Sequence, residues 1–115
     1  MVRIKRVYEK RDSTDGFRVL VDRLWPRGMK KEQAKVDLWM KDVAPSDALR
    51  KSFHHEAMKW PDFEKKYQAE LKTKKEFITE LKKLEKKHGT LTLLFGAKDE
   101  EHNQAAIIAS ALKKS

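Results

Sequence analysis

The sequence predicts one α/β domain over residues 1–115. It is expected to hold a small, mostly parallel sheet of about four strands, flanked by helices in a three-layer, Rossmann-like sandwich. Three observations support this expectation. Short runs of apolar and β-branched residues alternate with longer stretches whose apolar residues recur every three or four positions. The run Leu91–Phe95 is almost wholly apolar, as in a strand covered on both faces. A chain of 115 residues has material for one core.

The first predicted strands occupy residues 2–8 and 17–22, and the residues between them end in a turn signal, Asp15-Gly16. A parallel crossover normally takes a dozen or more residues, and this link, 9–16, has eight. The two strands are therefore either an antiparallel hairpin or joined by an unusually tight link, and we favour the hairpin. A short helix at 30–35 and a third strand at 36–40 follow.

The next two helices are marked by their first residues. Ser46 is a good N-cap for one helix. The triplet 60–62, Trp-Pro-Asp, begins the other, because proline and an acidic residue both favour a first turn. Phe63, Tyr67 and Leu71 repeat every four residues and predict its buried face.

The last part of the chain predicts helix, strand, helix. Apolar residues within 77–84 indicate a helix that ends at Gly89, a residue suited to a left-handed cap. The strand Leu91–Phe95 comes next. Asp99 is expected to cap a final helix whose apolar face lies within 105–112.

Composition excludes several functional classes. The chain has no cysteine, which removes disulfides, thiolate metal sites and cysteine nucleophiles. Its longest apolar run, 105–109, is far shorter than the roughly 20 residues that cross a bilayer. The first residues lack the apolar core of a signal peptide. We therefore expect a cytoplasmic protein with no membrane partner.

The charge is strongly basic. The 27 Lys and Arg exceed the 18 Asp and Glu, for a net charge of +9. Most of the cations are lysines, whereas base readout favours arginine. Lysines alternate with acidic residues between 59 and 87, which is typical of a solvated helical face. A nucleic-acid-binding module that uses this surface remains the alternative function.

An anion site is predicted at the carboxyl edge of the sheet, where open α/β sheets place their ligands. Arg23 and Arg27 follow the second strand, Lys41 follows the third and Lys98 follows the fourth. Ser46 marks a helix N-terminus at the same edge, and helix N-termini favour negative charge. The alternative is that Arg23 pairs with its neighbour Asp22 and that the lysines are merely solvated.

No cofactor or metal is predicted. The chain lacks both glycine-rich nucleotide motifs. Asp22, Asp42 and Asp99 follow strands, but cations at the same edge argue against a metal cage. The adjacent histidines of the His54-His55-Glu56 run point to different sides of a helix, so they do not form a zinc pair.

Catalysis has only two candidates. His102 lies near the predicted anion site, where it could transfer a proton, and Asp22 is the other candidate. No serine lies in a nucleophile motif, so a Ser–His–Asp triad has no support.

The segment Arg-Val-Leu-Val-Asp-Arg-Leu-Trp-Pro-Arg-Gly at 18–28 is distinctive. Together with Trp-Met-Lys-Asp-Val-Ala-Pro-Ser at 39–46, Arg50, and Lys98-Asp99 with Asn103, it resembles the bacterial YeaO-like family, part of a larger group of domains of unknown function. The resemblance covers essentially the whole chain. It implies a compact α/β fold in the cytoplasm and brings no established substrate. It also implies that one site contains Arg23, Arg27, Lys41, Ser46, Arg50 and Lys98.

These observations lead to one leading hypothesis, that the protein binds a phosphorylated or otherwise anionic small molecule at the carboxyl edge. Arg23 and Arg27 would clamp the anion, Lys41 and Lys98 would neutralise it, and Trp25 would cover it. Ser46, Arg50 and Asn103 complete the predicted site. A structural or partner-binding protein is a third hypothesis, beside the nucleic-acid module.

Overall fold

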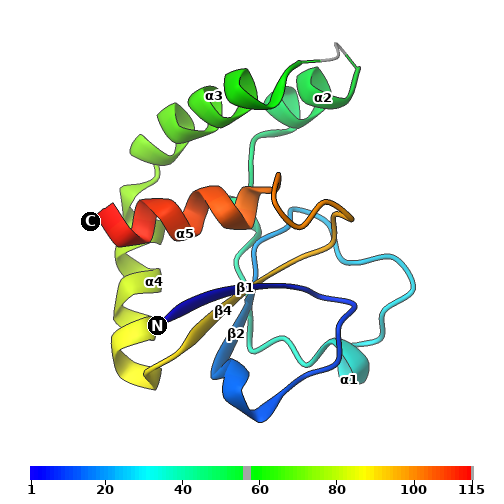
Figure 1. Ribbon diagram of the computed structural model, residues 1–115, viewed down its shortest axis with the longest axis vertical. Helices are drawn as coiled ribbons and strands as arrows, with labels where there is room; N and C mark the ends of the chain where they lie inside the picture. The colour runs from blue at the N-terminus through cyan, green and yellow to red at the C-terminus, as the bar shows by residue number, and fades with distance from the viewer. Residues whose placement is uncertain (56–57, 115) are drawn as a thin grey trace.

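The computed structural model describes residues 1–55 and 58–114, with only the backbone of residues 54 and 55. Four parallel strands form one sheet in the order β1-β4-β2-β3 (Figure 1). Their bounds are β1 Val2–Arg6, β2 Phe17–Leu20, β3 Leu38–Trp39 and β4 Leu91–Phe95. The predicted α/β class is therefore confirmed, although the third strand is only two residues long.

Strand β4 is the centre of the sheet. It pairs with β1 on one side and β2 on the other, with Leu91 opposite both Val2 and Phe17. All five of its residues are buried. A strand with neighbours on both edges and layers on both faces has no polar side, which explains its almost wholly apolar sequence; the hydroxyl of buried Thr92 donates to Asp15 O at 2.6 Å.

The predicted hairpin between the first two strands is wrong. β4 lies between β1 and β2, and all three run in the same direction. The chain returns through residues 7–16, including a 3₁₀ turn at Ser13–Asp15, and enters β2 through Gly16 at φ 65°. Ten extended residues reach about 33 Å, roughly twice the length of a five-residue strand. The tight link is long enough because it needs no helix.

The two faces of the sheet are covered unequally. On one face lie four helices, α2 Asp47–His55, α3 Trp60–Lys72, α4 Lys75–His88 and α5 Gln104–Lys114. α4 and α5 pack on the strands, while α3 packs on α4 and α5 and α2 on α3 (Figure 1). The other face has a thinner layer, the segment 24–36 with the one-turn helix α1 Lys31–Ala34, packed on Val7, Leu20 and Leu94.

The helix ends agree with the predicted ones except at α5. Ser46 Oγ accepts the Leu49 amide at 3.2 Å, as an N-cap should, and Gly89 ends α4 at φ 82°. Asp99 does not cap the last helix, because its carboxylate accepts the amides of Glu101 and His102 in a separate turn. Asn103 is the cap of α5, and its Oδ1 accepts the Ala106 amide at 3.0 Å. None of the described helices is both long and apolar enough to cross a bilayer.

Candidate functional site

A cavity of about 250 Å³ opens at the carboxyl edge of β2 and β4. The segments that follow these two strands form one side of it. The N-terminal turns of α2, α3 and α5 also contribute lining residues, among them Arg50, Trp60 and Gln104. This is the edge at which open parallel sheets bind ligands.

Asp22 lies in the wall of the cavity, just after β2. Its Oδ2 accepts the Gly96 amide at 2.8 Å, and its Oδ1 accepts the side-chain amide of Gln104. The carboxylate therefore ties together the ends of β2 and β4 and the start of α5. Burial raises its pKa to about 6, although the two hydrogen bonds act in the opposite direction.

Arg23 follows Asp22 and holds the loop before α2. Its Nε donates to Pro45 O and its Nη2 to Ala44 O, both at 3.2 Å. Its ion pair is with Asp47, at 3.9 Å, and not with Asp22 as the alternative interpretation expected. Part of the guanidinium therefore serves the fold, while the side chain also lines the cavity.

Arg50 reaches the cavity from α2. Its Nη2 donates to Asp47 Oδ1 at 3.4 Å. Its Nε is buried and has no hydrogen-bond partner among the described residues. A buried donor without a partner costs about 1–3 kcal/mol. Arg50 is therefore held in a position that fold stability alone does not favour.

An aromatic wall closes one side of the cavity. Phe63 packs with Phe53 and Trp60, at ring-centroid distances of 4.6 and 5.4 Å. The His102 ring lies 5.1 Å from Trp60, and its Nδ1 is 3.0 Å from Asp99 Oδ2. The hydrogen bonds from the His102 and Glu101 amides lower the pKa of Asp99. The wall offers flat apolar contact beside the two arginines.

Five of the predicted site residues line the cavity. They are Asp22, Arg23, Arg50, His102 and Asn103. Asn103 is 3% exposed and its Nδ2 donates to Asp99 O at 3.0 Å, so it both caps α5 and shapes the cavity. The five residues come from three separate segments of the chain, which the parallel sheet brings to one edge.

Four other predicted residues are not part of the lining. Trp25 belongs to the layer on the opposite face, and its Nε1 donates to Met29 O at 2.7 Å. Lys41 is exposed, with Nζ 5.1 Å from the centroid of the Trp39 ring. Arg27 and Lys98 are also exposed. The structure thus separates these four from the cavity.

Ser46 lies beside the cavity, and its amide and hydroxyl both form hydrogen bonds that hold the fold. Its amide donates to Glu70 Oε1 at 2.9 Å and its hydroxyl to Glu70 Oε2 at 2.5 Å, while the hydroxyl oxygen caps α2. These bonds join the start of α2 to α3. Ser46 therefore positions Arg50, four residues later on the same helix.

Sequence reasoning missed the aromatic wall and Gln104. The sequence places Trp60 at a helix start and Phe63 on a buried helix face, and the signal for their role is that both lie in the first turn of a helix that begins at the carboxyl edge. Phe53 lies further along α2, and its position in the sequence carries no such signal. The side chains of His54 and His55, and all of Glu56, lie outside the described residues. Within the described residues no group of three His, Asp or Glu could hold a metal ion.

Comparisons with known proteins agree on one family. A family model described as "Inactive DUF488-N3 subclade" matches residues 1–115. The chain is 42% identical over 112 residues, 97% of its length and 96% of the relative, to "Uncharacterized protein YeaO" of Escherichia coli (strain K12). It is 40% identical over 111 residues, 96% of its length and 92% of the relative, to "Uncharacterized protein Rv3073c" of Mycobacterium tuberculosis (strain ATCC 25618 / H37Rv). No solved structure matches the chain.

Proposed function

The chain belongs to the inactive DUF488-N3 subclade, and we propose that it binds a small anionic molecule, such as a phosphorylated metabolite, in the cavity at the carboxyl edge. One observation carries the proposal. Two arginines and the N-terminal turns of three helices meet at the same cavity. Helix N-termini and guanidinium groups both favour negative charge, and their effects add where they converge.

Asp47 is the present partner of both arginines, and its hold is weak. Its Oδ1 lies 3.9 Å from Arg23 Nε and 3.4 Å from Arg50 Nη2. Charge-assisted hydrogen bonds are normally about 2.7–2.9 Å long. Asp47 is also 63% exposed, so solvent screens both pairs. A phosphate or carboxylate with better geometry would take its place.

The aromatic wall supports a ligand that has a ring or another apolar part beside its anionic group. Phe53 and Trp60 present apolar surface on the same cavity as Arg50. Binding pockets for small molecules typically measure about 300–1,000 Å³. A cavity of about 250 Å³ is therefore suited to a small metabolite.

The arrangement supports binding rather than turnover. Both oxygens of Asp22 accept hydrogen bonds from Gly96 and Gln104, which leaves it poorly placed to take a proton from a substrate. His102 is held at Nδ1 by Asp99. The family description, "inactive", agrees with a role in binding.

The experiment is a titration with phosphate, pyrophosphate, nucleotides and sugar phosphates, followed by thermal shift and calorimetry at low and high salt. Arg50→Ala is expected to weaken the best ligand about tenfold or more, because it removes charged hydrogen bonds worth about 1.5–3 kcal/mol. Asp47→Asn is expected to strengthen it, because the competing carboxylate is neutralised.

Arg27→Ala is the matched control, since it removes the same charge from outside the cavity. It is expected to change affinity by less than about twofold, given the screening of exposed charges. An equal loss in both arginine variants would contradict the proposal. So would a shift common to all polyanions and abolished by salt, which would favour the lysine-rich surface and nucleic acid.

A further inference from the structure

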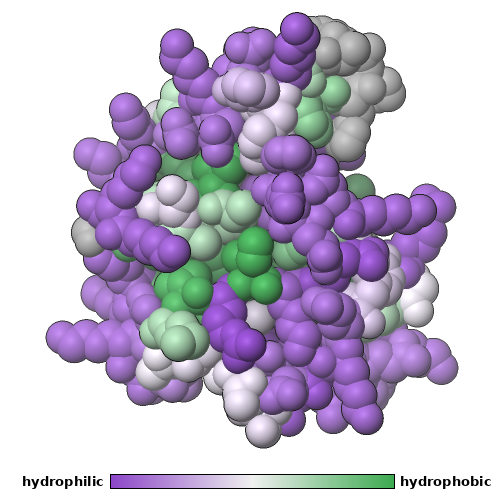
Figure 2. Space-filling view, in the orientation of Figure 1, coloured by the Kyte–Doolittle hydropathy of each residue, from purple (hydrophilic) through white to green (hydrophobic). Residues whose placement is uncertain are grey.

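A second concave surface lies between α3, α4 and α5, away from the strand ends. We call it the helix groove, and its volume is about 760 Å³. Its floor is apolar, with Leu71 from α3, Ile78 from α4, and Ile107 and Ala111 from α5. Figure 2 shows apolar side chains gathered over α5 and beside it, surrounded by hydrophilic ones.

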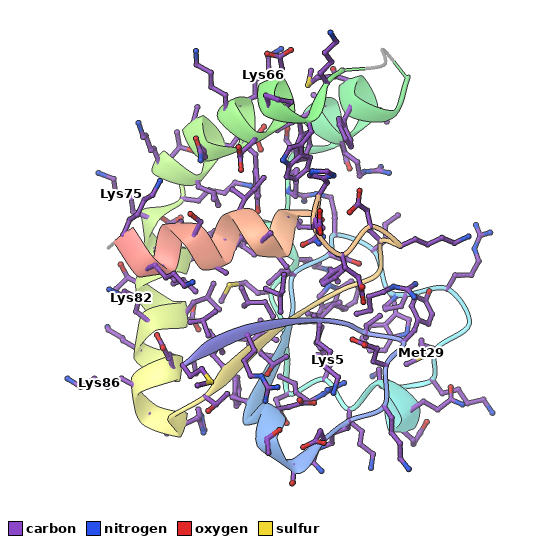
Figure 3. All side chains as sticks on the ribbon, viewed as in Figure 1. Lys5, Met29, Lys66, Lys75, Lys82 and Lys86 are labelled. Carbon is purple, nitrogen blue, oxygen red and sulfur yellow. The ribbon has the colours of Figure 1, made fainter. Side chains whose placement is uncertain are left out.

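Lysines form the rim of the helix groove. Lys65 and Lys72 lie on α3, Lys75 on α4 and Lys114 on α5, and all four are exposed. Figure 3 shows Lys75 extending away from the ribbon where α4 begins. Among the described residues, none of the four forms an ion pair, and no Asp or Glu lines the groove. The rim therefore presents four ammonium groups that have no ion-pair partner among the described residues.

We propose that the helix groove binds an acidic amphipathic helix of a partner protein. Such a helix would bury apolar residues spaced at i, i+3 or i+4, and i+7 against the floor. Its flanking carboxylates would meet the lysine rim. Burying apolar surface supplies the affinity, and the opposite charges set orientation and speed association.

The composition of the groove favours a helix over a nucleic acid. The described lining includes no arginine and no aromatic residue, the side chains that read bases or stack on them. A phosphate backbone would also gain nothing from a floor made of Ile78, Ile107 and Ala111. A second copy of the chain is disfavoured because it would bring its own net charge of +9.

The test uses a fluorescent peptide designed with Leu at helical spacing and Glu on both flanks. A scrambled peptide of the same composition serves as control. Fluorescence anisotropy is measured at physiological salt with the wild type and two triple variants. One, Lys65→Glu, Lys72→Glu and Lys75→Glu, reverses the rim. The other, Lys10→Glu, Lys30→Glu and Lys31→Glu, makes the same charge change at exposed lysines outside the groove.

The rim variant is expected to weaken peptide binding at least about tenfold, and the distant variant less than about threefold, because screening limits charges beyond about 8 Å. The scrambled peptide is expected to bind at least about tenfold more weakly. Equal losses in both variants, equal binding of the scrambled peptide, or no binding at millimolar protein would each overturn the proposal.

Two further arms separate the competing explanations. A 20-base-pair DNA duplex that displaces the peptide and itself depends on the rim lysines would assign the groove to nucleic acid and overturn the proposal. Arg50→Ala is expected to leave peptide binding unchanged, because Arg50 lines the other cavity. A third variant, Lys65→Gln, Lys72→Gln and Lys75→Gln, removes the charge of the rim without reversing it. If circular dichroism shows that this variant is folded and its peptide affinity is unchanged, the rim lysines do not bind the acidic helix and the proposal is overturned.

Discussion

Two aspartates stand at opposite ends of β2, and their surroundings differ sharply. Asp15 precedes the strand and is 2% exposed. Arg18 Nη1 donates to it at 2.5 Å, Lys5 Nζ at 3.1 Å and the Asp12 amide at 3.1 Å. Burial would raise the pKa of Asp15, but these hydrogen bonds outweigh it and the pKa is lowered.

Asp22 follows the same strand and has no cation within ion-pair distance among the described residues. Its donors, the Gly96 amide and the Gln104 side chain, are neutral. Burial therefore dominates, and its pKa rises to about 6. The neighbouring Arg23 donates to Pro45 and Ala44 instead.

The contrast distinguishes a structural carboxylate from one at a candidate site. The guanidinium of Arg18 donates hydrogen bonds to Asp15, to Ala34 O at 2.8 Å and to Lys35 O at 3.0 Å, and these bonds tie β2 to the α1 layer. Each of the three guanidinium nitrogens of Arg18 thus donates a hydrogen bond, and a buried ion pair held in this way stabilises one geometry. At the other end Arg23 and Arg50 line the cavity and pair weakly with Asp47, so neither neutralises the carboxylate of Asp22.

The largest expected effect comes from breaking the structural pair. Arg18→Met removes the main cation beside buried Asp15, and removing one partner of a buried pair costs about 3–5 kcal/mol. Urea unfolding should show a correspondingly lower midpoint. Adding Asp15→Asn to Arg18→Met should recover part of this loss, because no buried charge then remains. A loss below about 1 kcal/mol for Arg18→Met would contradict the assignment.

The second effect is the pH dependence of Asp22. Its pKa is about 6 in the folded protein against an ordinary 3.8, so the folded state binds the proton more tightly. The resulting stabilisation is complete below about pH 4 and is lost as pH rises through about 6. The shift corresponds to at most about 3 kcal/mol. The stability of the wild type should therefore fall over this range.

Asp22→Asn should flatten this part of the profile. The asparagine can accept the Gly96 amide and donate to Gln104 once the Gln104 amide turns over. The pKa of Asp15 is lowered, so its contribution to stability is lost as pH falls below 3.8. This pH dependence is opposite in direction to that of Asp22, and it is the same in the wild type and in Asp22→Asn. Identical slopes between pH 4 and 7 for wild type and variant would show that Asp22 does not titrate in this way.

A smaller effect is expected at Gly96. A Cβ there would lie 2.9 Å from Asp22 Oδ2, so Gly96→Ala must displace the carboxylate. Overpacking of this kind costs about 1–3 kcal/mol. In an Asp22→Ala background the clashing oxygen is absent, and the same substitution should cost much less in a double-mutant cycle. Equal costs in the two backgrounds would place the strain elsewhere.

Much of the fold was predictable from local sequence because local physics decides it. The apolar run Leu91–Phe95 is a buried strand. Ser46 caps the start of a helix, and the repeat from Phe63 to Leu71 is a buried helix face. Burial periodicity and capping depend on residues a few positions apart, so they can be read from the chain. The edge of the sheet that holds the cavity was also located by a rule that needs only strand ends.

The tertiary structure decided what depends on distant partners. β4 lies between β1 and β2, so these two strands do not form the expected hairpin; instead, each pairs in parallel with β4. This arrangement also brought Gly96 and Gln104 to Asp22, more than 70 positions away. Which cations face the cavity followed from this packing. Arg23 and Arg50 line the cavity, whereas Arg27, Lys41 and Lys98 do not, because side-chain direction is set by contacts between segments that sequence order does not reveal.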